Sequence, residues 1–556
     1  MKPGFILSAN LLLVVCLTSG AGCTRDDGAN PSAPTTKAAD QSTSTPLGSS
    51  SASASTLAKP APAPDATKTA DESPASGEIP VAANVQKSSE ECQQLLGKIR
   101  ALSNNIPRLF QELTRPIDAI NSDMLQCMEL CETFLGSCQA LPSGMCEVQA
   151  ILARQLLARV EWFRRELRKN KKPENERKAA EQAYIDRLRG LSESALSCVS
   201  LSDQLKADTH RVLVELEERA GKYDKARQHA DEILTKYPSF DLIANMRFKK
   251  TRSYLNSYDY EGALKYVETL RKDHSDDDEM VLYNIAYFEA LKGLADLKGM
   301  EALMTEILAE YPLRLKSIEP KWLARQYTQW FYIAHFWIGF SRMAGGDVEG
   351  ARSAFLEHKA QVESLRAKQQ AKNQNLDPVI EVTHTHRTLD LLEFLDDFYG
   401  KTPPYDLNFG EFWMTKNTLS LKKSLGQVVI LMFRKPNDPR SVEFLKEIDR
   451  LVKELGDDGL QGAVCAYLLG RPNPERDSQK LQAFRDELAA LQIDLPGGFD
   501  PDREAQSFFR SVHGTVGTAS CVVIDRQGRI AYFMADPKTA NKALIRSVVQ
   551  RLLDSD

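Results

Sequence analysis

The sequence predicts a multidomain protein in which an all-α helical bundle and an α-solenoid of helix pairs precede an α/β domain. Three observations predict this order. A first segment carries cysteines and apolar residues in steps of three and four, and a helix-pair pattern then recurs about every 37 residues. Near residue 430, six consecutive apolar residues lead through a charged turn into a helical pattern. With 556 residues, the chain is long enough for about three or four domains.

The charge balance argues against a nucleic-acid ligand. Charged residues make up 26% of the chain and the formal net charge is −5, so no basic excess is available for phosphates or for an anionic membrane face. Protein or peptide partners are the expectation.

Residues 1–23 have the pattern of an export signal. An apolar run from Phe5 to Leu17 is followed by small residues and Cys23, and it is too short to span a membrane. The ending resembles a bacterial lipoprotein signal, although Gly20 replaces the usual Leu, and this resemblance implies lipidation of Cys23. The protein is then anchored in the cell envelope and faces the periplasm. The alternative is ordinary cleavage near Ala21 or Gly22, which gives a soluble secreted protein.

Residues 24–86 are rich in Ser, Ala, Thr and Pro and contain no aromatic side chain. Such a segment buries too little apolar surface to offset the entropy lost on ordering, so we expect a disordered tether. Its r.m.s. span is roughly 45 Å.

The pattern of residues 87–205 predicts a helical domain that contains cysteines. One helical seam is formed by Ile117, Ile120, Met124, Cys127, Cys131, Phe134 and Cys138. A turn at 142–144 then places Cys146 at the start of the next helix.

Six cysteines in an exported helical domain suggest three disulfides: the candidates are Cys92, Cys127, Cys131, Cys138, Cys146 and Cys198. We predict a Cys138–Cys146 bond, with Cys127 and Cys131 pairing to Cys92 and Cys198 in an order that stays open. Buried free thiols are the alternative. A metal site is disfavoured because no histidine stands at ligand spacing beside these cysteines.

Residues 206–399 carry the repeated pattern. Residues 220–226, followed by 233–238, resemble a tetratricopeptide repeat, and weaker units follow at 260–263, before Pro312 and at 346–351. Stacked repeats of this kind imply a concave groove that holds a peptide. The aromatic cluster at 330–337 is expected either to line that groove or to pack between helices.

The pattern of residues 400–556 predicts a domain of alternating strands and helices. Val428–Phe433 reads as a buried strand, Pro439–Leu455 as a helix, and 461–468 as a second strand; a helix at 480–491, a helix after Asp500 and a closing hairpin at 517–534 follow. The order of these elements and the residues of the central strand resemble the TlpA-like branch of the thioredoxin superfamily.

The resemblance also shows what is missing. The family's Cys-x-x-Cys stands at a helix start, where N–H groups and the helix dipole favour a thiolate. The matching residues here are Asp438, Pro439, Arg440 and Ser441, and Ala519 stands where the family has a cis-proline. We expect Asp438 to cap the helix and Pro439 to occupy its first position. No catalytic residue is therefore predicted.

Two functions follow from these features. The first is an envelope-anchored interaction scaffold with a redox-inactive thioredoxin-like domain, a protein or peptide partner, no cofactor or metal, and a membrane attachment through the N-terminal lipid only. The second, implied by the resemblance, is a thiol-disulfide oxidoreductase or a peroxide reductase of the AhpC-TSA type. Its nucleophile would have to be Cys465, Cys521 or a cysteine of the helical domain. Cys465 and Cys521 are not expected to be bonded to each other, because they lie two strands apart, about 9.6 Å. Each lies within an apolar strand and is therefore expected to be buried.

Overall fold

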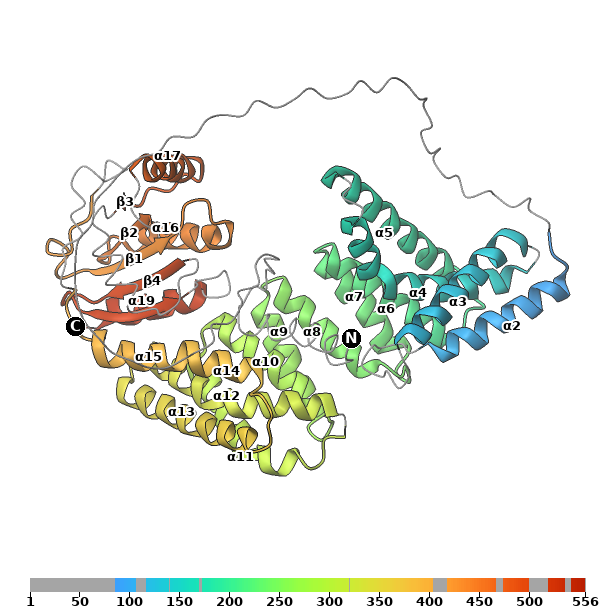
Figure 1. Cartoon of the computed structure of the whole chain (residues 1–556), viewed down its shortest axis with the longest axis horizontal. Helices are drawn as coiled ribbons and strands as arrows, with labels where there is room; N and C mark the ends of the chain where they lie inside the picture. Colours follow the sequence, from blue (N-terminus) through green and yellow to red (C-terminus); the bar gives the residue numbers. More distant parts are fainter. Residues whose placement is uncertain are drawn as a thin grey trace, which may run out of the picture.

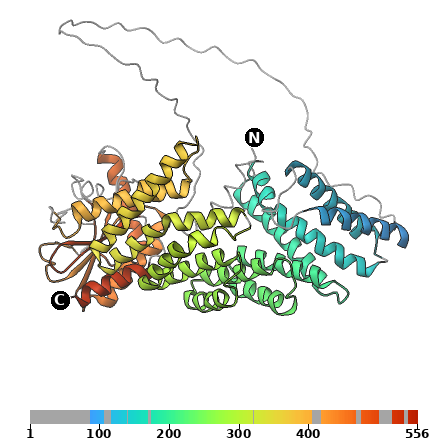
Figure 2. The same cartoon turned by 90° about the horizontal axis from the view of Figure 1, so that it is seen from below.

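The computed structural model describes residues 86–106, 117–139, 141–169, 173–319, 321–403, 418–466, 474–499, 519–535 and 542–555. A long series of helices occupies the N-terminal and central parts, and a mixed sheet lies at the C-terminal end (Figure 1, Figure 2). The predicted export signal with Cys23, and the tether up to residue 85, lie outside the described residues.

Four helices of the described residues form the cysteine-containing bundle: α2 (Ser89–Asn105), α3 (Ile117–Ser137), α4 (Pro142–Lys169) and α5 (Glu174–Leu196). Ser88 caps α2 through a reciprocal pair of hydrogen bonds with Glu91, the arrangement known as a capping box. The cysteine-bearing side of α3 packs against α2 and α4, as its spacing predicts. The same core continues into α6 (Asp203–Arg219) through Val212 and Leu216.

Two disulfides cross-link this bundle. Cys92 on α2 is bonded to Cys138, with their Cα atoms 5.6 Å apart. Cys146, in the first turn of α4, is bonded to Cys198, with a Cα separation of 6.3 Å. Both separations lie within the range that a disulfide requires.

The predicted Cys138–Cys146 bond is therefore wrong. Because α2 lies along α3, it brings Cys92 to Cys138, whereas Cys146 packs beside Ala195 at the end of α5 and meets Cys198 there. The predicted bonds of Cys127 and Cys131 are also wrong: both are free thiols, buried on the inner side of α3.

Four consecutive helix pairs follow the bundle. They are α6 with α7 (Tyr223–Lys236), α8 (Ile243–Asn256) with α9 (Tyr260–Asp273), α10 (Met280–Leu294) with α11 (Leu297–Arg314), and α12 (Lys321–Gly345) with α13 (Val348–Gln370). Each helix packs against the next along the chain. Pro312, expected beyond the end of a helix, lies instead in the last turn of α11.

Three of the four turns inside these pairs have the same N-capping arrangement. Asp259, Asp296 and Asp347 each cap the second helix by accepting a hydrogen bond from the N–H of a glycine three residues later, at 2.9 Å in each case. Counted from the equivalent Lys222, which makes no such cap, these positions recur at intervals of 37, 37 and 51 residues. The period predicted from the sequence is thus a period of helix starts.

The aromatic cluster of α12 packs inside the helical array. Trp330 and Trp337 are buried, and both make edge contacts with Phe288 of α10 at centroid distances of 5.0 and 4.8 Å. Phe331 stacks on Tyr311 of α11. These contacts favour the packing interpretation of the cluster over the groove interpretation. The helical series ends with α14 (Pro378–Thr383), η2 (His384–Thr388), α15 (Leu389–Glu393) and η3 (Phe394–Phe398), in which η2 and η3 are π-helical turns.

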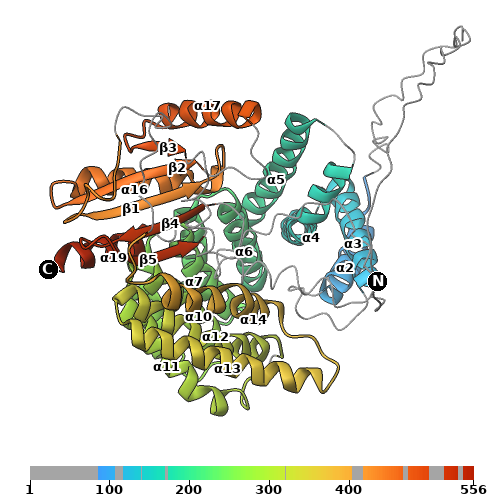
Figure 3. The same ribbon diagram turned by 60° about the vertical axis from the view of Figure 1, so that its left-hand side comes forward.

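The C-terminal sheet has five strands in the order β3-β2-β1-β4-β5. They are β1 (Val428–Arg434), β2 (Leu460–Ala466), β3 (Gly497–Phe499), β4 (Ala519–Ile524) and β5 (Ile530–Ala535), accompanied by α16 (Val442–Leu455), α17 (Pro474–Ala490) and α19 (Lys542–Asp554). Strands β1, β2 and β3 are parallel to one another. Strand β4 is antiparallel to β1, and β5 is antiparallel to β4 (Figure 3). This is the thioredoxin-like arrangement that the resemblance implied. The predicted helix after Asp500 lies outside the described residues.

The sheet and the helix pairs share one hydrophobic core. Helix α19 contacts β1 on one side and α10 and α12 on the other. Phe394 of η3 packs against Phe533 of β5, and the backbones of Gly400 and Lys401 exchange hydrogen bonds of 2.8 and 2.9 Å with Ile530, which covers the outer edge of β5. The junction is therefore a packed interface. Among the described helices, none is both long enough and apolar enough to cross a membrane.

Candidate functional site

The candidate site is the turn between β1 and α16, where a thioredoxin-like sheet carries its redox cysteines. Arg434, the last residue of β1, lies in register with Ala466 of β2 and with Ala519 of β4. The two altered parts of the expected redox site, the turn at 438–441 and Ala519, are thus brought to the same edge of the sheet, as the resemblance implied.

A fully buried arginine fills this position. The side chain of Arg434 has no exposed surface, and its Nη2 donates hydrogen bonds to Oε1 of Glu487 at 2.9 Å and to the carbonyl oxygen of Asp438 at 3.0 Å. Its Nε donates to Oγ of Ser441 at 3.1 Å. One guanidinium therefore joins both ends of the 438–441 turn to α17.

Glu487 holds the turn from the other side. Its second oxygen, Oε2, accepts a hydrogen bond of 3.0 Å from the backbone N–H of Asn437. Asn437 has φ of +59°, a left-handed conformation that asparagine tolerates better than most residues. The ion pair between Arg434 and Glu487 thus fixes an otherwise unfavourable turn.

The helix start differs from the prediction. Pro439–Ser441 forms a short 3₁₀ turn, and α16 begins only at Val442, with Ser441 in the N-cap position. The Ser441 hydroxyl does not cap the helix, because it accepts the Arg434 hydrogen bond and donates to the carbonyl of Asp438 at 3.3 Å. Asp438 and Ser441 are both buried. Asp438 therefore precedes the 3₁₀ turn and is not the N-cap residue of α16, contrary to the prediction.

This arrangement has little capacity for redox chemistry. A disulfide reductase needs a thiolate at an exposed helix start, and the turn contains no sulfur. Two nitrogens of the guanidinium, Nε and Nη2, are already bound to a hydroxyl, a carbonyl and a carboxylate, whereas Nη1 is buried without a hydrogen-bond partner among the described residues. What the cluster can do is hold the loop in one conformation.

The two cysteines of the sheet lie near the turn but inside the core. Cys465 pairs in register with Phe433 and Cys521 with Met432, on opposite sides of β1. They form no disulfide with each other and are buried, as predicted. Burial raises the pKa of the Cys521 thiol, which disfavours the reactive thiolate.

The free thiols of the bundle form a second sulfur pair. Cys127 and Cys131 stand one helical turn apart on α3 and interact with each other: the Cys131 thiol donates a hydrogen bond to Cys127, and this bond, together with burial, raises the pKa of Cys131. Both are fully buried, so neither presents sulfur to a substrate.

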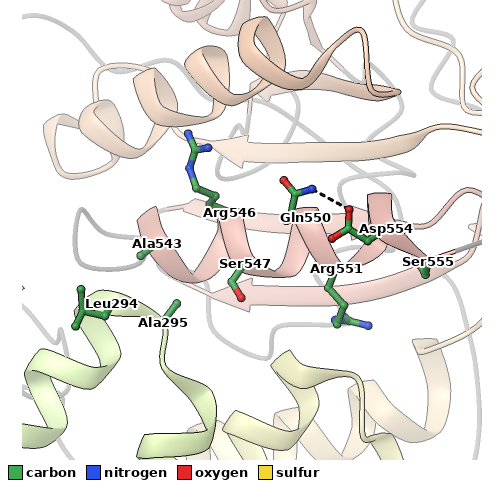
Figure 4. A pocket seen from close by; sticks show the side chains of 9 residues that line it. All are labelled: Leu294, Ala295, Ala543, Arg546, Ser547, Gln550, Arg551, Asp554 and Ser555. Carbon is green, nitrogen blue, oxygen red and sulfur yellow. Dashed lines mark hydrogen bonds between the residues drawn. The ribbon is translucent and has the colours of Figure 1, made fainter.

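A cavity of about 710 Å³ lies elsewhere, between the end of α10 and α19. Figure 4 shows Arg546 and Arg551 leaving α19 in opposite directions. Arg546 binds both oxygens of Glu454 at 2.8 and 2.7 Å, and Arg551 packs against Gly346 in the α12–α13 turn. A Cβ atom at Gly346 would lie 2.5 Å from Nη1 of Arg551, and φ there is +89°, so this turn requires glycine. The cavity lies at the junction between the sheet and the helix pairs.

The second cavity, of about 440 Å³, lies among α12, α13 and α14. Arg325 and Gln329 both donate to Oδ2 of Asp377, at 2.8 and 3.0 Å, and Tyr332 and Gln369 contribute an aromatic ring and an amide. The lining thus combines hydrogen-bonding groups with an aromatic face. In the described ranges, no three His, Cys, Asp or Glu side chains converge as metal ligands would.

Sequence reasoning missed Arg434 and Glu487. Arg434 could have been noticed, because it continues the alternation of Ile430 and Met432 and therefore points to the same side of β1. An arginine at such a position requires a buried acidic partner. No pattern identifies Glu487, which lies 53 residues away on a helix with several other acidic residues.

No family model and no curated protein matches the chain. Among solved structures, it is similar to a thiol:disulfide interchange protein of the thioredoxin family from Chlorobium tepidum TLS, with 16% identity and a TM-score of 0.23 over 28% of this chain and 97% of the other. It is also similar to a thiol-disulfide isomerase from Corynebacterium glutamicum, with 19% identity and a TM-score of 0.24 over 28% and 99% of the two chains. Each likeness is confined to 28% of this chain.

Proposed function

We propose that this protein is an interaction scaffold of the bacterial cell envelope, which binds a protein or peptide and carries a redox-inactive thioredoxin-like domain. One observation carries the proposal: Arg434, bound to Ser441, Asp438 and Glu487, occupies the place of a redox dithiol. A turn held by a buried ion pair supports a structural role for the site.

The position of the remaining sulfur supports the same conclusion. The cysteines of the described ranges are either bonded in pairs or fully buried as thiols. A thiol that does not meet solvent cannot attack a disulfide or a peroxide at a useful rate.

The helix pairs supply the binding surface in this proposal. Their resemblance to tetratricopeptide repeats implies peptide binding, and the cavity near Tyr332 and Gln369 offers the donors, acceptors and aromatic ring that an extended peptide needs. Because the pairs share their core with the sheet, a peptide bound there would be held on one continuous body.

Export and anchoring complete the proposal. Lipidation of Cys23 would attach the chain to a membrane, and the tether of residues 24–86 would hold the folded part roughly 45 Å away from it. The two disulfides of the bundle are typical of an oxidising compartment such as the periplasm.

The redox part of the proposal is tested by insulin reduction. Purified protein with dithiothreitol should precipitate insulin no faster than dithiothreitol alone, and a Cys465→Ser/Cys521→Ser variant should behave identically. A rate clearly above the blank that is lost in the variant would establish the oxidoreductase alternative.

The binding part is tested by proximity labelling from the intact anchored protein. We expect a defined set of neighbouring proteins that is lost when the cavity is altered by Tyr332→Ala and Gln369→Ala. Lys265→Glu, an exposed change on α9, is the matched control and should leave the labelled set unchanged. An identical set from all variants would exclude this cavity as the binding surface.

A further inference from the structure

One arginine at the junction of the sheet and the helix pairs lacks a partner among the described residues. Nε and Nη2 of Arg551, on α19, are withdrawn from solvent, and neither has a hydrogen-bond partner there. A cation that leaves water without a counter-charge is costly, because the lost hydration is not replaced. The position of Arg551 therefore favours an anionic ligand beside it.

The two unpartnered nitrogens form the edge of a guanidinium that binds oxyanions. Nε and Nη2 carry parallel N–H groups, whose spacing matches two oxygens of a carboxylate or a phosphate. Arg100 of the same chain shows this edge when it is filled: its Nε and Nη2 donate to Oε1 and Oε2 of Glu147 at 2.6 and 2.7 Å. Arg551 thus offers the same bidentate edge without a carboxylate.

The side chain of Arg551 borders the cavity of about 710 Å³ between α19 and the end of α10. Ser547 stands one turn earlier on α19, lines the same cavity and points to the same side of the helix (Figure 4). A water molecule takes about 30 Å³, so the cavity holds a small anion together with water. Binding requires the guanidinium to turn toward the cavity, a side-chain movement that is common when ligands bind.

The other charged side chains of the lining have partners of their own. Arg546 binds both oxygens of Glu454. Asp554 is exposed and accepts a hydrogen bond of 2.9 Å from Gln550, and Figure 4 shows this pair on the opposite side of α19 from the Arg551 guanidinium. The charge of Arg551 is therefore left for a ligand.

We propose that Arg551 and Ser547 bind a small oxyanion, a carboxylate or a phosphate, in the cavity between α19 and α10. Two oxygens of the anion accept hydrogen bonds from Nε and Nη2 of Arg551, and one accepts a hydrogen bond from the Ser547 hydroxyl. The bound anion neutralises a charge where the sheet meets the helix pairs, and so it stabilises their junction. The site is separate from the 438–441 turn and from the cavity near Tyr332.

The test is thermal unfolding of the full chain in an amine buffer that contains no oxyanion. Sodium phosphate, sodium acetate or sodium chloride is then added at equal ionic strength. A ligand that binds the folded state raises the midpoint of unfolding as its site fills. We expect a saturating rise with phosphate or acetate, and the anion that saturates at the lower concentration identifies the ligand class. Chloride should give only the non-saturating response to ionic strength.

Variants then assign the response to the cavity. Arg551→Gln should lower the affinity for the anion at least about tenfold, because a bidentate charge-assisted pair is lost. Arg551→Lys keeps the charge but not the edge, so it should lower the affinity less, and Ser547→Ala should also weaken binding. Arg546→Gln, at the same cavity, is the matched control and should respond like the wild type. The proposal is overturned if phosphate and acetate act no differently from chloride, or if Arg551→Gln leaves their effect unchanged.

Discussion

The helical bundle and the thioredoxin-like sheet use sulfur in opposite ways. In the bundle, two disulfides join segments 46 and 52 residues apart, and they constrain the unfolded chain. In the sheet, Cys465 and Cys521 are packing atoms, and the turn that would carry reactive sulfur is held by Arg434 and Glu487. The comparison teaches that, among the described residues, the disulfides lie in the helical bundle, whereas the cysteines of the domain with the redox-type fold form none.

The largest effect that this comparison predicts is on the charged turn. Glu487→Ala leaves the Arg434 guanidinium buried without its carboxylate, and removing one partner of a buried ion pair costs about 3–5 kcal/mol. Urea denaturation should show a loss of this size. Glu454→Ala, which removes an exposed ion pair with Arg546, is the control and should cost less than about 1 kcal/mol. Equal effects of the two changes would contradict the structural role of Glu487.

A somewhat smaller effect is expected from the sulfur of the bundle. Replacing Cys92 and Cys138 by alanine should lower the free energy of unfolding by about 2–4 kcal/mol, because the disulfide no longer restricts the unfolded chain. Dithiothreitol should destabilise the wild-type bundle more than this variant, in which only one disulfide remains to be reduced. If reductant affects both proteins alike, the Cys92–Cys138 bond is absent in solution.

Acid should weaken the helix pairs through a buried histidine. Burial and the neighbouring His384 lower the pKa of His358 to about 3, and its Nδ1 lies 2.6 Å from Oγ1 of Thr388. Because the unfolded group titrates near 6.5, the unfolded state binds more protons between pH 6.5 and 3, and stability falls as the pH falls through that window. The expected slope is about 1.4 kcal/mol per pH unit.

The matched variant for this slope is His358→Gln, which removes the titrating group. Its free energy of unfolding, measured between pH 7 and 5, should depend less on pH than that of the wild type. Parallel curves for the two proteins would assign the acid sensitivity to other groups.

The smallest effect concerns the sheet thiols. Cys465 and Cys521 should react slowly with an alkylating reagent in the native protein and rapidly after denaturation, since burial excludes the reagent and disfavours the thiolate. Mass spectrometry of the labelled peptides measures both. Fast native labelling of Cys521 would show an accessible sulfur next to β1 and would favour the redox alternative.

The sequence predicted the fold wherever the signal was local or periodic. The apolar run of β1, the seam of α3 and the 37-residue spacing of helix starts all appear in the structure. The disulfide partners could not be predicted in the same way, because the pairing depends on how α2 lies against α3 and how α5 returns to α4.

The resemblance selected the turn at 438–441 as the candidate site but did not predict the contacts found there. The resemblance located Asp438, Ser441 and Ala519, whose meeting at Arg434 follows from strand register. The Arg434–Glu487 ion pair at the turn could not be predicted from the sequence, because Glu487 reaches the turn only through the packing of α17. Helix α16 also starts later than expected, because the Ser441 hydroxyl bonds to Arg434 and not to the helix N–H groups.

The most direct test of the account is a double-mutant cycle on Arg434 and Glu487, with Arg434→Met, Glu487→Leu and the double variant compared by urea denaturation. If the ion pair holds the turn, each single change is strongly destabilising, the double variant recovers much of the loss, and the coupling energy is about 1–3 kcal/mol. Effects that add within about 0.5 kcal/mol would show that the two residues do not act together, and would contradict the account.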